Sequence, residues 1–142
     1  MHIILAIVIF ILIASVFVVN NDNSYVLIED KFNKKIRYTT AHMGFKKPFP
    51  IERVIARIPI EKTITKYIEI GENGMDFELS FKVHDPLSGH IFLNYFDEYV
   101  FEFIYNVYNL DMTKEEASKA VFDKLSKGMN ANGVTLKSFE FK

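Results

Sequence analysis

The hydrophobic pattern begins with an unbroken apolar run from Ile3 to Val19, in which Ser15 is the single weakly polar residue. As an α-helix these 17 residues rise about 25 Å, close to the roughly 30 Å hydrocarbon core of a bilayer. A cleaved signal peptide, which normally has a basic start and a small-residue exit site, and a buried core helix are the alternatives. The run favours an uncleaved transmembrane anchor over residues 1–19, followed by a polar hinge over residues 20–24.

The strongest strand signal lies at residues 76–83, where polar and apolar side chains alternate until the run stops before Pro86. This period of two is typical of a strand with one buried and one solvent-facing side. Pro86 lacks the backbone donor that a ladder needs, so it ends the strand. The first half is therefore predicted as an antiparallel sheet with two hairpins: residues 25–28 with 36–40, and residues 63–70 with 76–83 through a turn at 71–74.

The second half changes to a helical period. Apolar side chains recur at i, i+3, i+4 and i+7 within residues 91–110, which predicts a helix with one buried stripe, made of Leu93, Phe96, Val100, Phe103, Ile104 and Val107. Thr113 and Glu116 have the spacing of a capping box, so a second helix is expected to begin there and to stop near Gly128.

The order of the elements indicates the fold class. After the second helix, the turn Asn132-Gly133 leads into a closing strand over residues 134–141. Strands followed by helices favour an α+β fold, with an antiparallel sheet, two helices and a C-terminal strand. Residues 25–142 are expected to form this single domain behind the N-terminal transmembrane helix.

Composition and charge narrow the function classes. The chain has a net charge of −1 and no cysteine, which excludes disulfides, thiolate metal sites and cysteine nucleophiles. It has no basic stripe, so no nucleic-acid partner is expected. Basic residues soon after the apolar run favour a domain on the cytoplasmic side of the membrane, namely Lys31, Lys34, Lys35 and Arg37.

One short motif invites a catalytic interpretation. His84 and Asp85, with Ser80 or Ser88 nearby, resemble part of a triad, but sequence neighbours rarely face one another as a triad requires. An aspartate that caps a turn is the favoured interpretation. The other histidines are far apart and lack metal-ligand spacing. We therefore expect no enzyme activity, no catalytic residue, no cofactor and no metal.

Three segments carry a family resemblance: GFKKPFPIERV at Gly44–Val54, Val-His-Asp-Pro at Val83–Pro86, and the Gly133-Val134 pair before the last strand. In their order and spacing they resemble the stomatin–prohibitin–flotillin family, also called band 7. The double-proline loop is most similar to the branch that regulates membrane-bound ATP-dependent proteases in bacteria. The resemblance covers residues 25–142.

Two features depart from the family pattern. Met43 stands where the family usually has a proline before the loop glycine. The family also continues beyond the closing strand into a long charged helix that forms coiled coils, whereas this sequence ends at Lys142. Assembly through that helix is therefore not implied.

The resemblance implies a non-enzymatic, single-pass membrane-anchored scaffold or regulatory module. Its expected partners are the lipid bilayer, further copies of itself, and an integral membrane protease or transporter. The alternative is a membrane-tethered small-ligand-binding domain or hydrolase, with a pocket between sheet and helices and His84 and Asp85 at its rim.

Two surfaces are candidates for these contacts. A loop with large apolar and basic side chains is expected to touch the membrane, unless both rings pack into the domain; its residues are Phe45, Lys46, Lys47 and Phe49. The aromatic helix has more rings than one buried face can hold. Its opposite face is therefore expected to contact a neighbouring copy or another partner, through Tyr95, Tyr99, Glu102 and Asn106.

Overall fold

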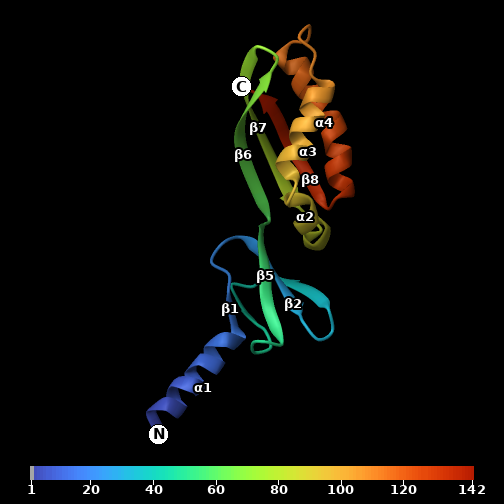
Figure 1. Ribbon diagram of the computed structural model, residues 1–142. Coiled ribbons are helices and arrows are strands. Elements are labelled where there is room, and N and C mark those ends of the chain that lie inside the picture. Colours follow the sequence, from blue (N-terminus) through green and yellow to red (C-terminus); the bar gives the residue numbers. More distant parts are fainter. Residues whose placement is uncertain (1) are drawn as a thin grey trace. The chain divides into compact units, whose positions relative to one another are not determined.

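The computed structural model describes residues 2–142 and divides the chain into two compact units, residues 1–59 and residues 60–142 (Figure 1). Unit 1 contains helix α1 and two small antiparallel sheets, and unit 2 contains an antiparallel sheet with three helices. The predicted α+β class is confirmed. The domain expected over residues 25–142 includes parts of both units.

Unit 1 begins with helix α1 (His2–Val16) and continues as five short strands. β1 pairs with β4, and β2 lies between β3 and β5 in a second sheet, with every pairing antiparallel. The predicted hairpin of residues 25–28 with 36–40 is thus present as β2 and β3. The strands are β1 (Phe17–Val19), β2 (Ser24–Asp30), β3 (Lys35–Thr39), β4 (Met43–Phe45) and β5 (Glu52–Pro59).

Helix α1 ends at Val16, three residues before the predicted end of the anchor, because Phe17–Val19 pair with β4. Val18 is 3% exposed and clusters with the buried Val26 and Ile28. The prediction of one anchor helix over residues 1–19 is therefore wrong at its C-terminal end, and its first residue lies outside the described residues. Within residues 2–142, no helix has both the length and the apolar character needed to cross a membrane.

The predicted polar hinge forms a hydrogen-bonded corner. Asn20 is buried, and its side-chain amide donates to the Ser24 carbonyl at 2.7 Å. The Ser24 hydroxyl donates back to the Asn20 side-chain oxygen at 2.9 Å. The His42 ring lies 2.9 Å from the Asn20 carbonyl, so a residue 22 positions away also holds this corner.

Unit 2 is a three-stranded antiparallel sheet, in the order β6-β7-β8, with α3 and α4 lying along one side of it (Figure 1). The predicted hairpin is present, although the turn contains only Gly71 and Glu72 because Ile70 already pairs with Asn73. Gly71 has φ +66°, a conformation that glycine adopts without strain. The elements are β6 (Glu61–Ile70), β7 (Asn73–Val83), α2 (Pro86–Leu93), α3 (Phe96–Val107), α4 (Lys114–Ala131) and β8 (Val134–Phe141).

The core of unit 2 follows the predicted alternation. The apolar side of β7 is buried, with Phe77, Leu79, Phe81 and Val83 each at most 3% exposed. Of the predicted helix stripe, Phe96, Val100 and Ile104 are buried. The single helix expected within residues 91–110 is instead two helices, since α2 starts at Pro86 and ends before α3.

The second predicted helix is α4, and its capping box is formed as expected. The Thr113 hydroxyl accepts from the Glu116 amide at 3.2 Å, and the Glu116 carboxylate accepts from the Thr113 amide at 3.0 Å. The helix continues past Gly128 to Ala131. A Cβ atom at Gly128 would lie 1.9 Å from the Tyr99 hydroxyl, so the glycine leaves the space on α4 that the tip of the Tyr99 side chain occupies.

Candidate functional site

The loop predicted to touch a membrane lies directly at the C-terminal end of α1. The Lys46 amide donates to the Val16 carbonyl, the last of the helix, at 2.9 Å. Phe45 pairs with Phe17, and their ring centroids are 5.2 Å apart. The end of the apolar helix and the start of the loop are thus joined by backbone and ring contacts.

A buried carboxylate fixes the shape of this loop. Glu52 accepts from the Arg37 guanidinium at 2.9 Å and from the Lys47 amide at 2.7 Å. Arg37 also donates to the Phe45 carbonyl at 2.8 Å, so one side chain links the sheet to the loop. The Arg37 hydrogen bond is the main reason that the pKa of Glu52 lies below its ordinary value, against the effect of burial.

Lys47 is held by a second ion pair. Its ammonium group lies 2.9 Å from the Asp30 carboxylate. The hydrogen bond to Lys47, followed by those from Asn33, holds the pKa of Asp30 well below its usual range. The same bond raises the pKa of Lys47. The charge of Lys47 is therefore neutralised locally, and the free basic charge beside the loop comes from other lysines.

Both rings of the loop are exposed, which answers the alternative that they pack into the domain. Phe45 is 65% exposed and Phe49 is 67% exposed. Phe32, in the β2–β3 turn, is 73% exposed, and the Lys31 ammonium lies 5.4 Å from the Phe49 ring centroid. We call this set the collar: Phe17, Lys31, Phe32, Phe45, Lys46 and Phe49.

The sequence interpretation missed Phe17, Lys31 and Phe32 as members of the collar. The signal was weak, because a phenylalanine between lysines in a turn is unusual but does not show which surface it joins. The hydrogen bond from the Lys31 amide to the Ile51 carbonyl, at 2.9 Å, brings the turn to the loop.

The second candidate surface is on α3, and the structure separates its four predicted residues. Glu102 and Asn106 are exposed, and Tyr95 is 43% exposed just before the helix. Tyr99 instead packs between Phe92 and Phe103, with ring centroids 5.1 and 4.7 Å away. Burial raises the pKa of the Tyr99 hydroxyl. Tyr99 thus belongs to the contact between α3 and α4.

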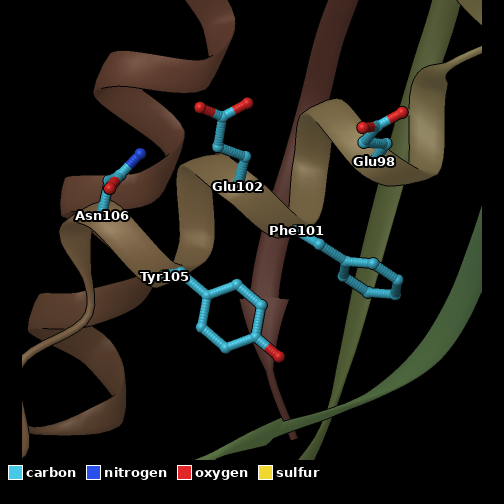
Figure 2. Close-up of a pocket in the computed structure, with 5 residues that line it drawn as sticks. All are labelled: Glu98, Phe101, Glu102, Tyr105 and Asn106. Carbon is cyan, nitrogen blue, oxygen red and sulfur yellow. The ribbon is translucent and has the colours of Figure 1, made fainter.

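An open hollow of about 650 Å³ lies along the outer face of α3 (Figure 2). Two carboxylates, two rings and one amide line it, and they come from Glu98, Phe101, Glu102, Tyr105 and Asn106. Phe101 and Tyr105 leave the helix on one side, whereas Glu102 and Asn106 leave it on the other (Figure 2). Tyr105 therefore occupies the place on this surface that the sequence interpretation gave to Tyr99.

The His84-Asp85 pair has structural partners. The Asp85 carboxylate accepts from the Leu87 amide at 3.1 Å and from the Ser88 hydroxyl at 2.7 Å, which caps α2 as predicted. The Ser88 hydroxyl is the main cause that lowers the pKa of Asp85. The His84 ring lies 3.0 Å from the Thr135 hydroxyl. Neither side chain lines the hollow on α3.

The comparisons with known proteins add no assignment. No protein-family model and no curated protein matches the chain. The resemblance to the stomatin–prohibitin–flotillin family stays a prediction.

Proposed function

We propose that the chain is a non-enzymatic, membrane-anchored scaffold or regulatory module, which self-associates or modulates an integral membrane protein such as a protease or a transporter. The observation that carries the proposal is the exposed apolar surface of α1. Ten large apolar side chains between Ile3 and Ile13 are 47–77% exposed. A helix that is apolar on every side is stable where lipid or protein surrounds it.

The energetics favour insertion of α1 but leave little margin. Each Ile, Leu, Phe or Val contributes about 0.3–0.6 kcal/mol at a helix centre, so ten contribute roughly 3–6 kcal/mol. The 15 residues of α1 rise about 22 Å, and each ångström of mismatch with the hydrocarbon core costs a fraction of a kcal/mol. Apolar groups just beyond the helix end that enter the interface would reduce this cost.

The collar supplies such groups. It lies at the C-terminal end of α1, where the headgroup region of one leaflet would be. Exposed phenylalanines enter the boundary between headgroups and hydrocarbon, and lysines are attracted to anionic headgroups by about 1 kcal/mol each. We expect Phe45 and Phe49 to enter this boundary, with Lys31 and Lys46 near the lipid phosphates.

The placement of the histidine and aspartate supports a non-enzymatic role. Asp85 uses its carboxylate to cap α2, and His84 lies against a threonine hydroxyl. The Asp85 carboxylate contacts the Ser88 hydroxyl, whereas the His84 ring contacts a different hydroxyl, that of Thr135. The two side chains therefore do not form one Ser-His-Asp triad, and the geometry favours a corner in the fold over a reactive centre.

Tryptophan fluorescence tests the position of the collar. The natural chain has no tryptophan, so Phe49→Trp introduces a single reporter. We expect full-length Phe49→Trp in vesicles of mixed neutral and anionic lipids to show blue-shifted emission and quenching by lipids brominated near the headgroup. The matched control is Tyr67→Trp, which replaces a 58% exposed ring on β6 of unit 2.

The control should emit as a water-exposed indole and resist brominated lipids. Water-like emission and no quenching from Phe49→Trp would contradict the membrane contact of the collar. Recovery of the full-length chain from the aqueous fraction without detergent would contradict the anchor itself.

A further inference from the structure

Strand β6 is an open edge of the sheet in unit 2. The order β6-β7-β8 gives β6 one strand neighbour. The Val83 amide donates to the Ile60 carbonyl at 2.8 Å, and Ile70 pairs with Asn73 at the two-residue turn. Even-numbered residues of β6 therefore bond to β7, and the backbone groups of odd-numbered residues point outward, because an antiparallel ladder alternates in this way.

One outward group already has a partner, which confirms the alternation. The Tyr105 hydroxyl donates to the Glu69 carbonyl at 2.8 Å. This bond covers the C-terminal end of the edge and ties α3 to it. The outward amides and carbonyls of Thr63, Thr65 and Tyr67 lie along the rest of the strand, where a further strand is able to pair with them.

The hollow on α3 lies beside this edge. Tyr105 lines the hollow and bonds to Glu69, while Lys66 of β6 forms an ion pair with Asp97 at the other end of α3. Figure 2 shows Phe101 and Tyr105 projecting from the same side of α3. Tyr105 reaches β6 through its bond to Glu69, and the Phe101 ring packs against Phe77 of the neighbouring strand β7, with ring centroids 5.9 Å apart. A strand added to β6 would thus place alternate side chains against these two rings.

The charge of the hollow selects the kind of side chain that enters it. Among the described residues, neither Glu98 nor Glu102 has an ion-pair partner. Unit 2 as a whole has nine Lys and no Arg against fourteen Asp and Glu, which gives a net charge of −5. A cationic group beside an aromatic face and two carboxylates gains both attractions.

We propose that β6 accepts an extended, basic segment of a partner protein as an additional strand, with one Lys or Arg of that segment entering the hollow that Phe101, Glu98 and Glu102 line. This mode of recognition takes affinity from backbone hydrogen bonds and specificity from the pocket beside the strand. A basic segment bound at β6 would be the partner of the proposed regulatory module, so this inference rests on that proposed function.

A second copy of the chain is a poorer occupant of this edge. Two β6 strands can pair antiparallel with nearly full overlap in two registers. One register places Glu61 opposite Glu69 at both ends of the pair, and the other places Lys66 opposite Lys66. Like charges directly opposite one another destabilise a strand pair. A basic segment avoids this repulsion and complements the acidic hollow.

The test selects peptides on the full-length chain in detergent micelles, where α1 is solubilised whether or not it inserts into a bilayer. Random 12-residue peptides displayed on phage are the probe, with empty micelles as the counter-selection. We expect enrichment of peptides with Lys or Arg among β-branched residues. The affinity of the best synthetic peptide is then measured by fluorescence anisotropy.

Two variants locate the binding. Thr65→Pro removes an outward amide without removing a bond to β7, and it should weaken binding at least about tenfold. Thr65→Val keeps the amide and should bind within about twofold of the natural chain. Combined Glu98→Gln and Glu102→Gln should weaken binding about tenfold and reduce its salt dependence.

The amides of Thr63, Thr65 and Tyr67 provide a measurement that needs no variant. Peptide binding should slow their hydrogen exchange in the natural chain. The proposal is overturned if no basic peptide is enriched, if Thr65→Pro binds as well as Thr65→Val, or if these amides stay unprotected. It is also overturned if the chain protects them by dimerising without peptide, since β6 would then be an interface between copies. Failure of α1 to insert into vesicles would contradict the membrane anchor and leave this result unchanged.

Discussion

A single lysine in the middle of α1 should abolish membrane insertion, whereas the same lysine near its end should not. Ile9 is at the centre of the helix His2–Val16 and is 47% exposed. A lysine at the centre of an inserted helix costs about 2.5–3.5 kcal/mol, and the lost isoleucine adds about 0.3–0.6 kcal/mol. The total, about 3–4 kcal/mol, is comparable to the whole gain of roughly 3–6 kcal/mol from ten apolar side chains.

Ile3→Lys is the matched control because it makes the same chemical change about 9 Å along the helix axis. A lysine near a helix end extends its ammonium group to the interface and costs much less. Both variants carry the same added charge, so a difference between them reports depth in the bilayer rather than charge.

The assay is alkaline extraction of membranes from cells that express each full-length chain, followed by flotation of the pellet. We expect the natural chain and Ile3→Lys to stay with the lipid and Ile9→Lys to move largely to the supernatant. Thermal unfolding of the two variants should match, because Ile9 and Ile3 are both exposed. Equal extraction of Ile3→Lys and Ile9→Lys would refute the reasoning that lipid surrounds α1.

Three further predictions concern the stability of the two units. Leu125→Ala deletes a fully buried side chain of α4 and should lower the free energy of unfolding by about 2–5 kcal/mol in urea denaturation; a loss below about 1 kcal/mol would contradict the packing. Thr113→Ala should cost about 1 kcal/mol by the same measurement, and Thr113→Ser should keep most of the cap. The pKa of Asp30 is depressed by Lys47, so this pair stabilises unit 1 fully above about pH 5 and progressively less as the pH falls below about 4. Asp30→Asn should therefore flatten the acid side of the stability–pH profile, and an unchanged profile would contradict the pair.

Local patterns predicted the parts of the fold that depend on local chemistry. The closing strand has the predicted bounds Val134–Phe141, because the alternation follows an Asn-Gly turn whose Gly133 has φ +78°. The capping box of α4 was predicted from two residues three apart. The hairpin of β6 and β7 likewise follows from one turn between two alternating segments.

Contacts between distant residues decided what the sequence did not reveal. The apolar run reads as one helix to Val19, but burial of Val18 depends on Val26 and Ile28 and on pairing with β4. Tyr99 has the helical position of an exposed residue, and its burial depends on a glycine 29 residues later. No periodicity within a helix or a strand encodes such contacts.

The same limit applied to the candidate surfaces. The sequence shows Phe45 and Phe49 as large apolar groups in a basic loop, but it does not determine whether their rings are exposed. Lys47 was grouped with them, although Asp30, 17 residues earlier, neutralises it. The rings that complete the two surfaces, Phe32 and Tyr105, were not selected, because their surroundings arise from the β2–β3 turn and from the edge of β6.

The net charge of −1 is the sum of two net charges of opposite sign, one on each unit. Unit 1 has eight Lys and Arg against four Asp and Glu, a net charge of +4, whereas unit 2 has a net charge of −5. Three of the four acids in unit 1 are used in ion pairs, by Arg37, Lys47 and Arg53. The cations of unit 1 that have no ion pair within the described residues are Lys31, Lys34, Lys35, Lys46 and Arg57.

This opposition has a consequence for the two proposals. Unpaired lysines beside an apolar helix attract anionic headgroups, and an acidic unit is repelled by them. The charge pattern thus favours a chain whose basic unit meets lipid while its acidic unit stays available to a basic protein segment. The attraction of the lysines to anionic headgroups and the attraction of the acidic hollow to a basic segment are both between exposed charges, so added salt should weaken both. Burial of α1 in hydrocarbon does not depend on charge and should persist. Retention of the natural chain on anionic vesicles at 1 M salt, together with loss of peptide binding, would therefore separate the proposed apolar anchor from the proposed electrostatic contacts of the two units.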